Sequence, residues 1–453
     1  MKKFLAFLLV VAMSISCLAG CSKTEEKPAA EPTKAEATAA PTEAPAATEA
    51  PEATEAPEVT EAPEVTDAPE VTDAPEVTDE PEITDEPEVT DAPEVTEVPE
   101  EPAFPEDVYL KDIFAEHGMK VGTCLSPMML NNSKAKNLIL DQFTSVTMEN
   151  AMKPDYLFNQ KQSRETGELV VEFNDDMIKM LDFAKENGLA VRGHTLVWYS
   201  QTPRWIFYKD FATKNGKVER EEMLERMESY IKQVFEKLDE MGYSDLFYAY
   251  DVVNEAWMED GSMRSWGNLW HEIIGDDYIW WAFYFADKYA PEHIKLFYND
   301  YNEQFKTQTL VDFVQTLKDE DGRYLIDGVG FQAHLYTMDD MPQYFNTVDT
   351  IAELGLDIQL TELDVCLGAY QNELPATDEN LAEQGRYYYN LINGLFERAD
   401  EGKINMEAIT FWGFSDGMSW RSSQSPVLYN AKLEPKPAFF GAAQLKDFAG
   451  FTE

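Results

Sequence analysis

The sequence has few cysteines, histidines and basic residues, and each shortage excludes a class of protein. Four cysteines among 453 residues are too few for a disulfide framework. No cluster of histidine, cysteine and aspartate has metal-binding spacing, and no glycine-rich phosphate loop is present. A formal net charge of -49 argues against binding nucleic acid and against electrostatic docking to anionic lipid. We therefore expect no metal, no cofactor and no nucleic-acid partner, and an acidic surface that suits a neutral substrate.

A long apolar run is also missing, although a short one opens the chain. Lys2 and Lys3 precede an apolar stretch over residues 4–12, which is too short to span a bilayer as a helix. Leu-Ala-Gly then precedes Cys21, and this order resembles the lipobox of a bacterial lipoprotein signal. We expect residues 1–20 to be removed and Cys21 to carry lipid. An ordinary secretory signal is the alternative.

Residues 21–104 begin with Cys21 and continue as a spacer. A proline recurs at every sixth position from Pro45 to Pro99, in units such as Pro-Glu-Val-Thr-Asp-Ala. Such a unit cannot bury a core, while proline and repelling carboxylates favour an extended chain. We expect a disordered linker that holds a catalytic domain, residues 105–453, away from the outer face of a bacterial cell membrane. The membrane contact would be made only by the lipid on Cys21.

Residues 105–453 predict one α/β domain, a (β/α)8 barrel. Short apolar or β-branched runs alternate there with amphipathic stretches such as 176–187 and 220–241. The predicted strands are 120–125, 145–149, 190–197, 249–254, 295–299, 328–332, 357–362 and 408–413. Each strand ends in polar or aromatic residues, and barrel active sites lie at the carboxyl ends of the strands. The predicted site is therefore at those ends.

Two of the strand ends carry a glutamate suited to acid–base chemistry. Glu255 follows Asp-Val-Val-Asn after the fourth predicted strand, and Glu362 lies in Thr-Glu-Leu-Asp at the end of the seventh. These strands face each other across a barrel, so both carboxylates can flank one sugar bond. Glycoside cleavage needs one acid to protonate the leaving oxygen and one carboxylate on the opposite face; a separation of about 5–5.5 Å indicates a retaining mechanism.

Six runs in this domain resemble those of glycoside hydrolase family 10, the barrel xylanases. They are TMENAMKP, RGHTLVW, DVVNE, GVGFQAH, LTELD and TFWGFSDGMSWR, spread over about residues 105–445. The resemblance implies a retaining endo-β-1,4-xylanase that acts on xylan or arabinoxylan, with Glu255 as acid/base and Glu362 as nucleophile. It also implies that His334 and Asp364 orient Glu362, and that Asn254 binds the 2-hydroxyl of the sugar.

The resemblance further implies a set of side chains that bind the sugar chain. The set is Glu149, Asn150, Lys153, His194, Trp198, Gln201, Asn254, Tyr301, Gln332, His334, Trp412 and Trp420. Two residues depart from the family pattern: Tyr199 stands where histidine is usual, and Tyr250 where tryptophan is usual. Both departures leave the subsite preference open.

Several choices stay open at this level. The same chemistry could act on cellulose or mixed-linkage glucan, and a binding-only barrel needs the aromatic residues but not the two glutamates. Cys124 and Cys366 are expected as buried free thiols on strands that are not neighbours, and the protein as a monomer. Four tryptophans could belong equally to the core or to the cleft: Trp205, Trp257, Trp266 and Trp270. Trp280 and Trp281 lie in a helical run and are expected to pack. Surface or satisfied polar roles are expected for His117, His271 and His293.

Overall fold

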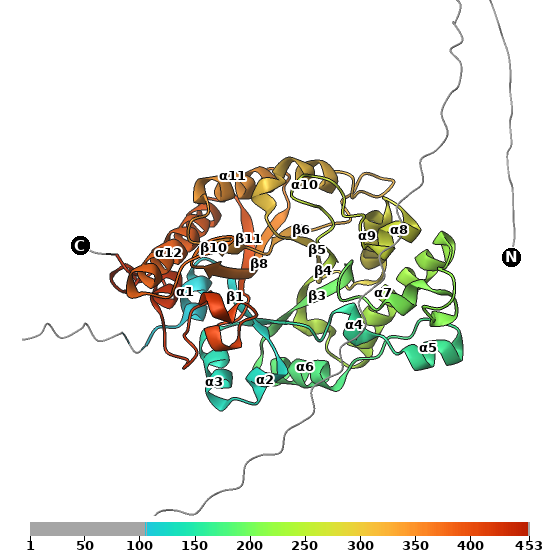
Figure 1. Cartoon of the computed structure of the whole chain (residues 1–453), viewed down its shortest axis with the longest axis horizontal. Coiled ribbons are helices and arrows are strands. Elements are labelled where there is room, and N and C mark those ends of the chain that lie inside the picture. The colour runs from blue at the N-terminus through green and yellow to red at the C-terminus, as the bar shows by residue number, and fades with distance from the viewer. Residues whose placement is uncertain (1–104, 106, 452–453) are drawn as a thin grey trace, which may run out of the picture. The chain divides into compact units, whose positions relative to one another are not determined.

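The computed structural model describes residue 105 and residues 107–451, and these residues form a closed parallel barrel surrounded by helices (Figure 1). The strand order is β1–β2–β3–β4–β5–β6–β8–β11, and β11 pairs with β1 to close the sheet. The predicted (β/α)8 fold is therefore confirmed. The predicted signal peptide, the lipid on Cys21 and the linker lie outside the described residues.

The eight barrel strands match the predicted ones to within a few residues at each end. They are β1 (Lys120–Leu125), β2 (Ser145–Met148), β3 (Ala190–Trp198), β4 (Phe247–Asn254), β5 (Lys295–Asp300), β6 (Gly328–Phe331), β8 (Asp357–Cys366) and β11 (Asn405–Phe411). A short strand, β7 (His334–Tyr336), pairs in parallel with the end of β8. The strands β9 (Gly368–Ala369) and β10 (Asn372–Glu373) form a small antiparallel hairpin. The largest difference is at β8, which continues past the predicted end because β7 supplies a further partner.

The helices on the outside of the barrel also follow the predicted pattern. They are α1 (Leu110–Glu116), α2 (Pro127–Leu130), α3 (Ser133–Gln142), α4 (Pro154–Leu157), α5 (Gln160–Thr166), α6 (Asp175–Asn187), α7 (Arg220–Glu240), α8 (Leu269–Ile274), α9 (Tyr278–Tyr289), α10 (Thr307–Val314), α11 (Met341–Ala352), α12 (Asp378–Asp400) and α13 (Pro437–Ala442). Helix α6 begins at Asp175 because the side chain of Asn174 caps it by accepting from the N–H of Met177. It ends at Gly188, which takes the left-handed conformation that favours glycine.

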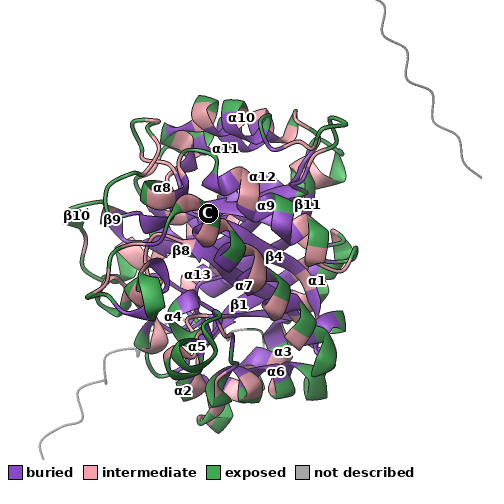
Figure 2. Ribbon diagram, turned by 90° about the vertical axis from the view of Figure 1, so that its right-hand side faces the viewer, coloured by how far each residue is buried: buried purple, intermediate pink, exposed green. Residues whose placement is uncertain are grey.

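The interior of the barrel is polar near its centre, and the apolar core lies between the strands and the helices. Figure 2 shows buried strands inside helices whose outer faces are exposed. Inside the barrel, Arg192 pairs with Asp251 and donates from Nε to Gln359 at 3.0 Å. Because β3 and β8 are not neighbours in the sheet, this contact crosses the interior. The guanidinium of Arg192 is buried, and each of its nitrogens has a hydrogen-bond partner, as burial of a charge requires.

The cysteines, histidines and tryptophans outside the motifs lie partly in the core and partly on the surface. Cys124 and Cys366 are buried free thiols, as predicted, and β11 separates their strands. His117 and His271 pair with Asp400 and Asp276 on the surface, and His293 lies 3.2 Å from the carbonyl oxygen of Ser244. Trp270 is in the core, Trp205, Trp280 and Trp281 pack against it, and Trp266 is 93% exposed. Among the described residues, no helix has both the length and the hydropathy to cross a bilayer.

Candidate active site

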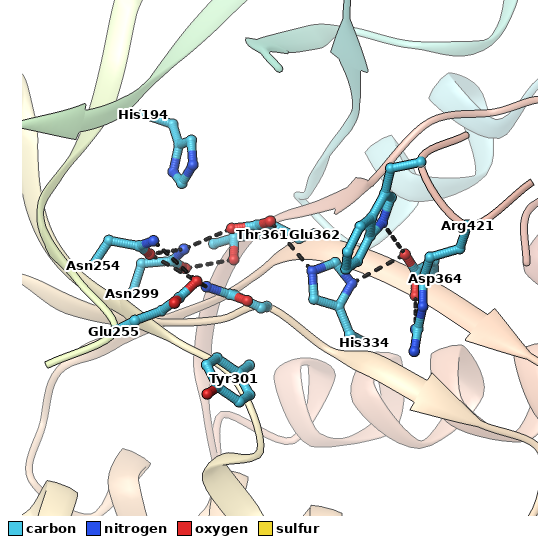
Figure 3. A network of polar contacts seen from close by, with 12 residues as sticks. His194, Asn254, Glu255, Asn299, Tyr301, His334, Thr361, Glu362, Asp364 and Arg421 are labelled. Atoms are coloured by element: carbon cyan, nitrogen blue, oxygen red, sulfur yellow. Dashed lines mark hydrogen bonds and ion pairs between the residues drawn. The ribbon is translucent and has the colours of Figure 1, made fainter. Parts of the chain in front are cut away.

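A cleft of about 780 Å³ opens at the carboxyl ends of the barrel strands. Both glutamates and the whole predicted sugar-binding set line it: Glu255, Glu362, Glu149, Asn150, Lys153, His194, Trp198, Gln201, Asn254, Tyr301, Gln332, His334, Trp412 and Trp420. Residues from seven separate segments of the sequence therefore meet in one cavity. Asp364 does not line the cleft but lies behind His334 (Figure 3).

Glu255 follows β4 and lies among neutral amides. Its Oε1 accepts from Nε2 of Gln332 at 3.1 Å and from Nδ2 of Asn254 at 3.3 Å. Burial raises the pKa of the Glu255 carboxyl; the hydrogen bond from Gln332 opposes this, and the negative charges of Asp300 and Glu362 add to it. The net effect is a raised pKa, which favours the protonated acid.

The backbone at Glu255 is held in an unusual conformation. Its φ of 55° lies in the left-handed region, which is costly for a residue with a side chain. Three hydrogen bonds fix this turn: the N–H of Glu255 donates to the carbonyl of Asn299 at 2.9 Å, and its carbonyl accepts from Nε of Arg264 at 3.0 Å. The next N–H, of Ala256, donates to Oη of Tyr298 at 3.0 Å. The turn directs a carboxyl group from the end of β4 into the cleft.

Glu362, in contrast, lies among cationic groups. It is 5% exposed, and its Oε2 is 3.4 Å from Nε2 of His334. Burial raises the pKa of Glu362, but the hydrogen bond from His334 and the positive charges of His194, His334 and Lys153 outweigh burial and lower it to about 2. Glu362 is therefore ionised over the whole ordinary pH range.

His334 links Glu362 to Asp364. Its Nδ1 lies 3.0 Å from Oδ2 of Asp364, and both flanking carboxylates outweigh burial and raise the pKa of the imidazole to about 10. Asp364 in turn accepts from Nε1 of Trp420 at 3.0 Å and from Nη1 of Arg421 at 2.8 Å. His334, Asp364 and Arg421 follow one another behind Glu362 (Figure 3). His334 and Asp364, the predicted orienting pair, thus lie in contact with each other, and His334 contacts Glu362.

Asn299 connects the two glutamates and was not assigned to the site from the sequence. Its Nδ2 donates to Oε1 of Glu362 at 2.8 Å and to Oδ1 of Asn254 at 2.9 Å, and Asn254 contacts Glu255. Oδ1 of Asn299 accepts from Thr361 at 2.6 Å. A Cβ at Gly330 would come within 2.5 Å of the Asn299 amide, so a glycine is needed there. The only sequence signal was the position of Asn299 at the end of a predicted strand.

One wall of the cleft combines a cation, two amides and an indole. Lys153 donates from Nζ to Oδ1 of Asn150 at 3.2 Å, and Gln201 donates to the same oxygen at 3.2 Å. The ammonium of Lys153 is 5.1 Å from the centroid of the Trp198 ring, and burial lowers its pKa. These groups offer donors and an aromatic face to a polar, uncharged ligand.

His194 is oriented from below by the buried pair of Arg192 and Asp251. Its Nδ1 lies 2.9 Å from Oδ2 of Asp251, which leaves Nε2 free to face the cleft. The ring of Trp412 packs edge-on against His194, with centroids 5.5 Å apart. The sequence motifs contained Arg192 and Asp251, but their supporting role required the fold.

The other side of the cleft holds a cluster around Arg264. Its Nη2 donates to Oη of Tyr301 at 2.8 Å, and its guanidinium lies 4.4 Å from the centroid of the Tyr199 ring. Burial, the charge of Glu255 and a hydrogen bond with Glu255 raise the pKa of the Tyr199 phenol, against the charge of Arg264. Tyr199 is thus close to Glu255, whereas Tyr250 is buried against Phe235 and does not line the cleft. Of the two departures, only Tyr199 bears on the site.

Further residues, which were not predicted, also line the cleft. They are Glu259, Asn302, Gln304, Phe305, Tyr336, Asp339, Tyr370 and Arg421. Most lie outside the quoted motifs, so no signal in the sequence placed them. Among the described residues, no group of three or more histidine, cysteine or acidic side chains is arranged to hold a metal ion.

Comparison with known proteins places these residues in a family. The chain is 36% identical over 340 residues to a bifunctional endo-1,4-beta-xylanase from Ruminococcus flavefaciens. The aligned region covers 73% of this chain and 33% of that protein. It is 35% identical over 356 residues to an endo-1,4-beta-xylanase from Acetivibrio thermocellus, with 74% and 32% covered. The chain therefore spans about a third of the length of these two curated relatives.

A solved structure is similar to this chain in fold and, over part of its length, in sequence. It comprises the N-terminal CBM22-1 and GH10 modules of an endo-1,4-beta-D-xylanase from Clostridium thermocellum, complexed with xylohexaose. The TM-score is 0.66 at 33% identity, and 76% of this chain and 69% of that chain are covered. The model of glycosyl hydrolase family 10 matches residues 109–445. The chain belongs to glycosyl hydrolase family 10.

Proposed function

We propose that the protein hydrolyses internal β-1,4 bonds of xylan with retention of anomeric configuration. The observation that carries the proposal is the pair Glu255 and Glu362, linked through Asn254 and Asn299 and shifted in opposite pKa directions. Two carboxyl groups with separated pKa values on opposite sides of one bond are the requirement for glycoside cleavage. The three relatives described above carry endo-xylanase names, which supports xylan as the polymer.

The chemistry divides between the two glutamates. In the first step the ionised Glu362 attacks the anomeric carbon, while protonated Glu255 gives its proton to the leaving oxygen, and the glycosidic bond breaks. In the second step Glu255, now a carboxylate, takes a proton from water, and that water replaces Glu362 on the sugar. Glu362 leaves as a carboxylate and Glu255 ends protonated, so both residues return to their starting states.

The surrounding residues would set the charge and orientation of Glu362 and the position of the sugars. His334, held by Asp364, keeps Glu362 ionised and correctly turned. Asn254 is positioned to hydrogen-bond the 2-hydroxyl of the sugar next to the cut, a contact that strengthens in the transition state. Glu149, Asn150 and Lys153 would hold the next sugar on the non-reducing side, and Tyr301 would support the leaving sugar.

Product analysis tests this function. The protein is incubated with soluble arabinoxylan and, separately, with carboxymethyl cellulose, and the products are separated by size over time. Early mixed xylo-oligomers, with nothing released from cellulose, are expected. Release from cellulose alone would move the substrate to a β-1,4-glucan, and no product from either polymer would favour a binding-only protein. The anomeric configuration of the first product, measured by NMR, tests retention.

We also propose that Cys21 carries lipid and anchors the enzyme, as a monomer, to the outer face of a bacterial cell membrane. The support comes from the sequence alone: a basic start, a short apolar run and Leu-Ala-Gly before the cysteine. Labelled palmitate should be incorporated into the expressed chain, and Cys21→Ala should abolish the label and release active enzyme. Incorporation that survives Cys21→Ala would reject this anchor.

A further inference from the structure

A second cavity, of about 650 Å³, lies on the other side of the loop that follows Glu255. Residues from that loop, from the start of α9 and from α10 and the turn after it line the cavity: Trp257, Gly261, Met263, Asp276, Asp277, Ile279, Trp280, Thr309, Asp312, Phe313, Thr316 and Leu317. None of them lines the catalytic cleft. The cavity therefore needs its own explanation.

The base of the second cavity is apolar and aromatic. Ile279, Phe313 and Leu317 are buried, and the ring of Trp257 packs on Phe313 with centroids 5.5 Å apart. Nε1 of Trp257 is buried and has no hydrogen-bond acceptor among the described residues. Nε1 of Trp280 is anchored, because it donates to the carbonyl oxygen of Lys318 at 2.9 Å. The base thus presents two indole rings to the cavity.

The rim of the second cavity is acidic and hydroxylated. Asp276, Asp277 and Asp312 supply carboxylates, and Thr309 and Thr316 supply hydroxyls. Asp276 and Asp277 already pair with His271 and Arg220, so each is held in place. Carboxylates accept hydrogen bonds from sugar hydroxyls and repel anionic ligands. Aromatic rings suit the apolar faces of sugar rings.

We propose that this cavity is a second binding site for a stretch of neutral β-1,4-linked xylan, separate from the catalytic cleft. The identity of the glycan rests on the proposed function. The indole rings of Trp257 and Trp280 would pack against the apolar faces of the sugar rings, and the rim carboxylates would accept from hydroxyls. A polymer held here lies next to the leaving-group side, since the same loop carries Arg264, which contacts Tyr301 and Glu255.

Binding stoichiometry is the direct test. In the Glu362→Gln background, which prevents hydrolysis, calorimetry with xylohexaose should show two binding events. Adding Trp280→Ala should weaken one of them at least about tenfold, a change of roughly 1.4 kcal/mol, and leave the other intact. Trp266→Ala is the matched control, since Trp266 is 93% exposed and lines neither cavity; it should leave both events intact. A single event in the Glu362→Gln background, or a second event that persists with Trp280→Ala, would overturn the proposal.

A second variant tests the site if Trp280→Ala does not fold. Trp280 packs against Tyr284, so circular dichroism must show that Trp280→Ala is folded. If it is not, Asp312→Ala decides: Asp312 lies on the rim, and within the described part of the chain its carboxylate accepts one hydrogen bond, from Nε2 of Gln308 at 2.8 Å. It should weaken the same event, and an unchanged event would count against the site.

Hydrolysis separates this proposal from the proposed function. With Glu362 intact, Trp280→Ala should lower the rate on insoluble xylan about fivefold, whereas the rate on xylotriose should not change, since a short substrate cannot reach both sites. An enzyme that hydrolyses xylan and shows one binding event rejects the second site alone. Two events without hydrolysis reject the proposed function alone.

Discussion

The Glu255 side and the Glu362 side of the cleft place the same functional group in opposite environments. Both carboxyl groups lose hydration, and burial alone would raise the pKa of each. At Glu255 the hydrogen-bond donors are neutral, among them the amides of Gln332 and Asn254 and the phenol of Tyr199, and the nearby charges of Asp300 and Glu362 are negative, so burial prevails. At Glu362 the cationic neighbours reverse the effect and lower the pKa to about 2.

This difference shows that partners, not depth, separate the pKa values of the two glutamates. The cations around Glu362 come from three elements: Lys153 after β2, His194 on β3 and His334 on β7. Asn299 lies between the two glutamates and contacts Glu362 without adding a charge. The predictions below remove one member at a time, beginning with the largest expected effect.

Loss of the nucleophile should have the largest effect. Glu362→Ala should lower kcat on xylan on the order of 10⁴-fold or more, because no other carboxylate can form the covalent intermediate. The measurement is the initial rate of reducing-sugar release, with circular dichroism to verify folding. Glu259→Ala is the matched control, since Glu259 lines the cleft but is exposed, and it should change the rate little. Substantial activity in Glu362→Ala would refute the assignment.

Loss of the acid should depend on the leaving group. Glu255→Ala should lower kcat on xylan by about 10²–10⁴-fold, the usual contribution of general acid–base catalysis. An aryl xyloside with a good leaving group needs no proton, so its first step, measured as the burst of released phenol, should be affected far less. Equal losses on the two substrates would contradict the acid role of Glu255.

Loss of the positive charge on His334 should bring the pKa values of the two glutamates closer together. In His334→Gln, the pKa of Glu362 should rise from about 2 toward or beyond its ordinary 4.5, because burial is then less opposed. The acidic limb of the kcat/KM profile should move to higher pH. An unmoved limb would mean that the imidazolium does not set the charge of Glu362.

The same substitution has a consequence for stability. The pKa of His334 is raised from 6.5 to about 10, so its contribution to stability is complete below pH 6.5 and is lost as pH rises through about 10. Urea unfolding of wild type and His334→Gln should therefore differ most near pH 6 and converge above pH 10. A constant difference would assign the effect to packing instead.

The smallest effect is expected at Tyr199, the departure from the family pattern near Glu255. Its hydrogen bond with Glu255 favours the carboxylate, so Tyr199→Phe should move the alkaline limb of kcat/KM upward. A protonated histidine, as in Tyr199→His, should move that limb downward. Neither variant should lose more than about tenfold in kcat/KM, the usual value of one hydrogen bond. If the alkaline limb moves in neither variant, Tyr199 does not affect the pKa of Glu255.

Much of this site could be predicted from the sequence because its residues come from strand ends. The alternation of strands and helices and the six motifs put all fourteen cleft-lining predictions in one cavity. Tyr250 is the counterexample: it precedes Asp251 on β4, and alternate residues of a strand point to opposite sides, so it faces Phe235 rather than the cleft. Loop residues such as Glu259 and Tyr370 could not be predicted, because no periodic pattern constrains a loop.

By itself, the sequence determined the barrel, the family and the two glutamates, because strand and helix periods and short motifs are local properties of the chain. Only the tertiary structure decided that Asn299 bridges the pair, that Arg192 and Asp251 support His194, and that Trp257 packs against the core and also lines a second cavity. These features depend on contacts between residues far apart in sequence, as between Asn299 and Glu362 at 2.8 Å. The charge of each glutamate depends on those contacts too, since a pKa is set by the groups that surround it in space.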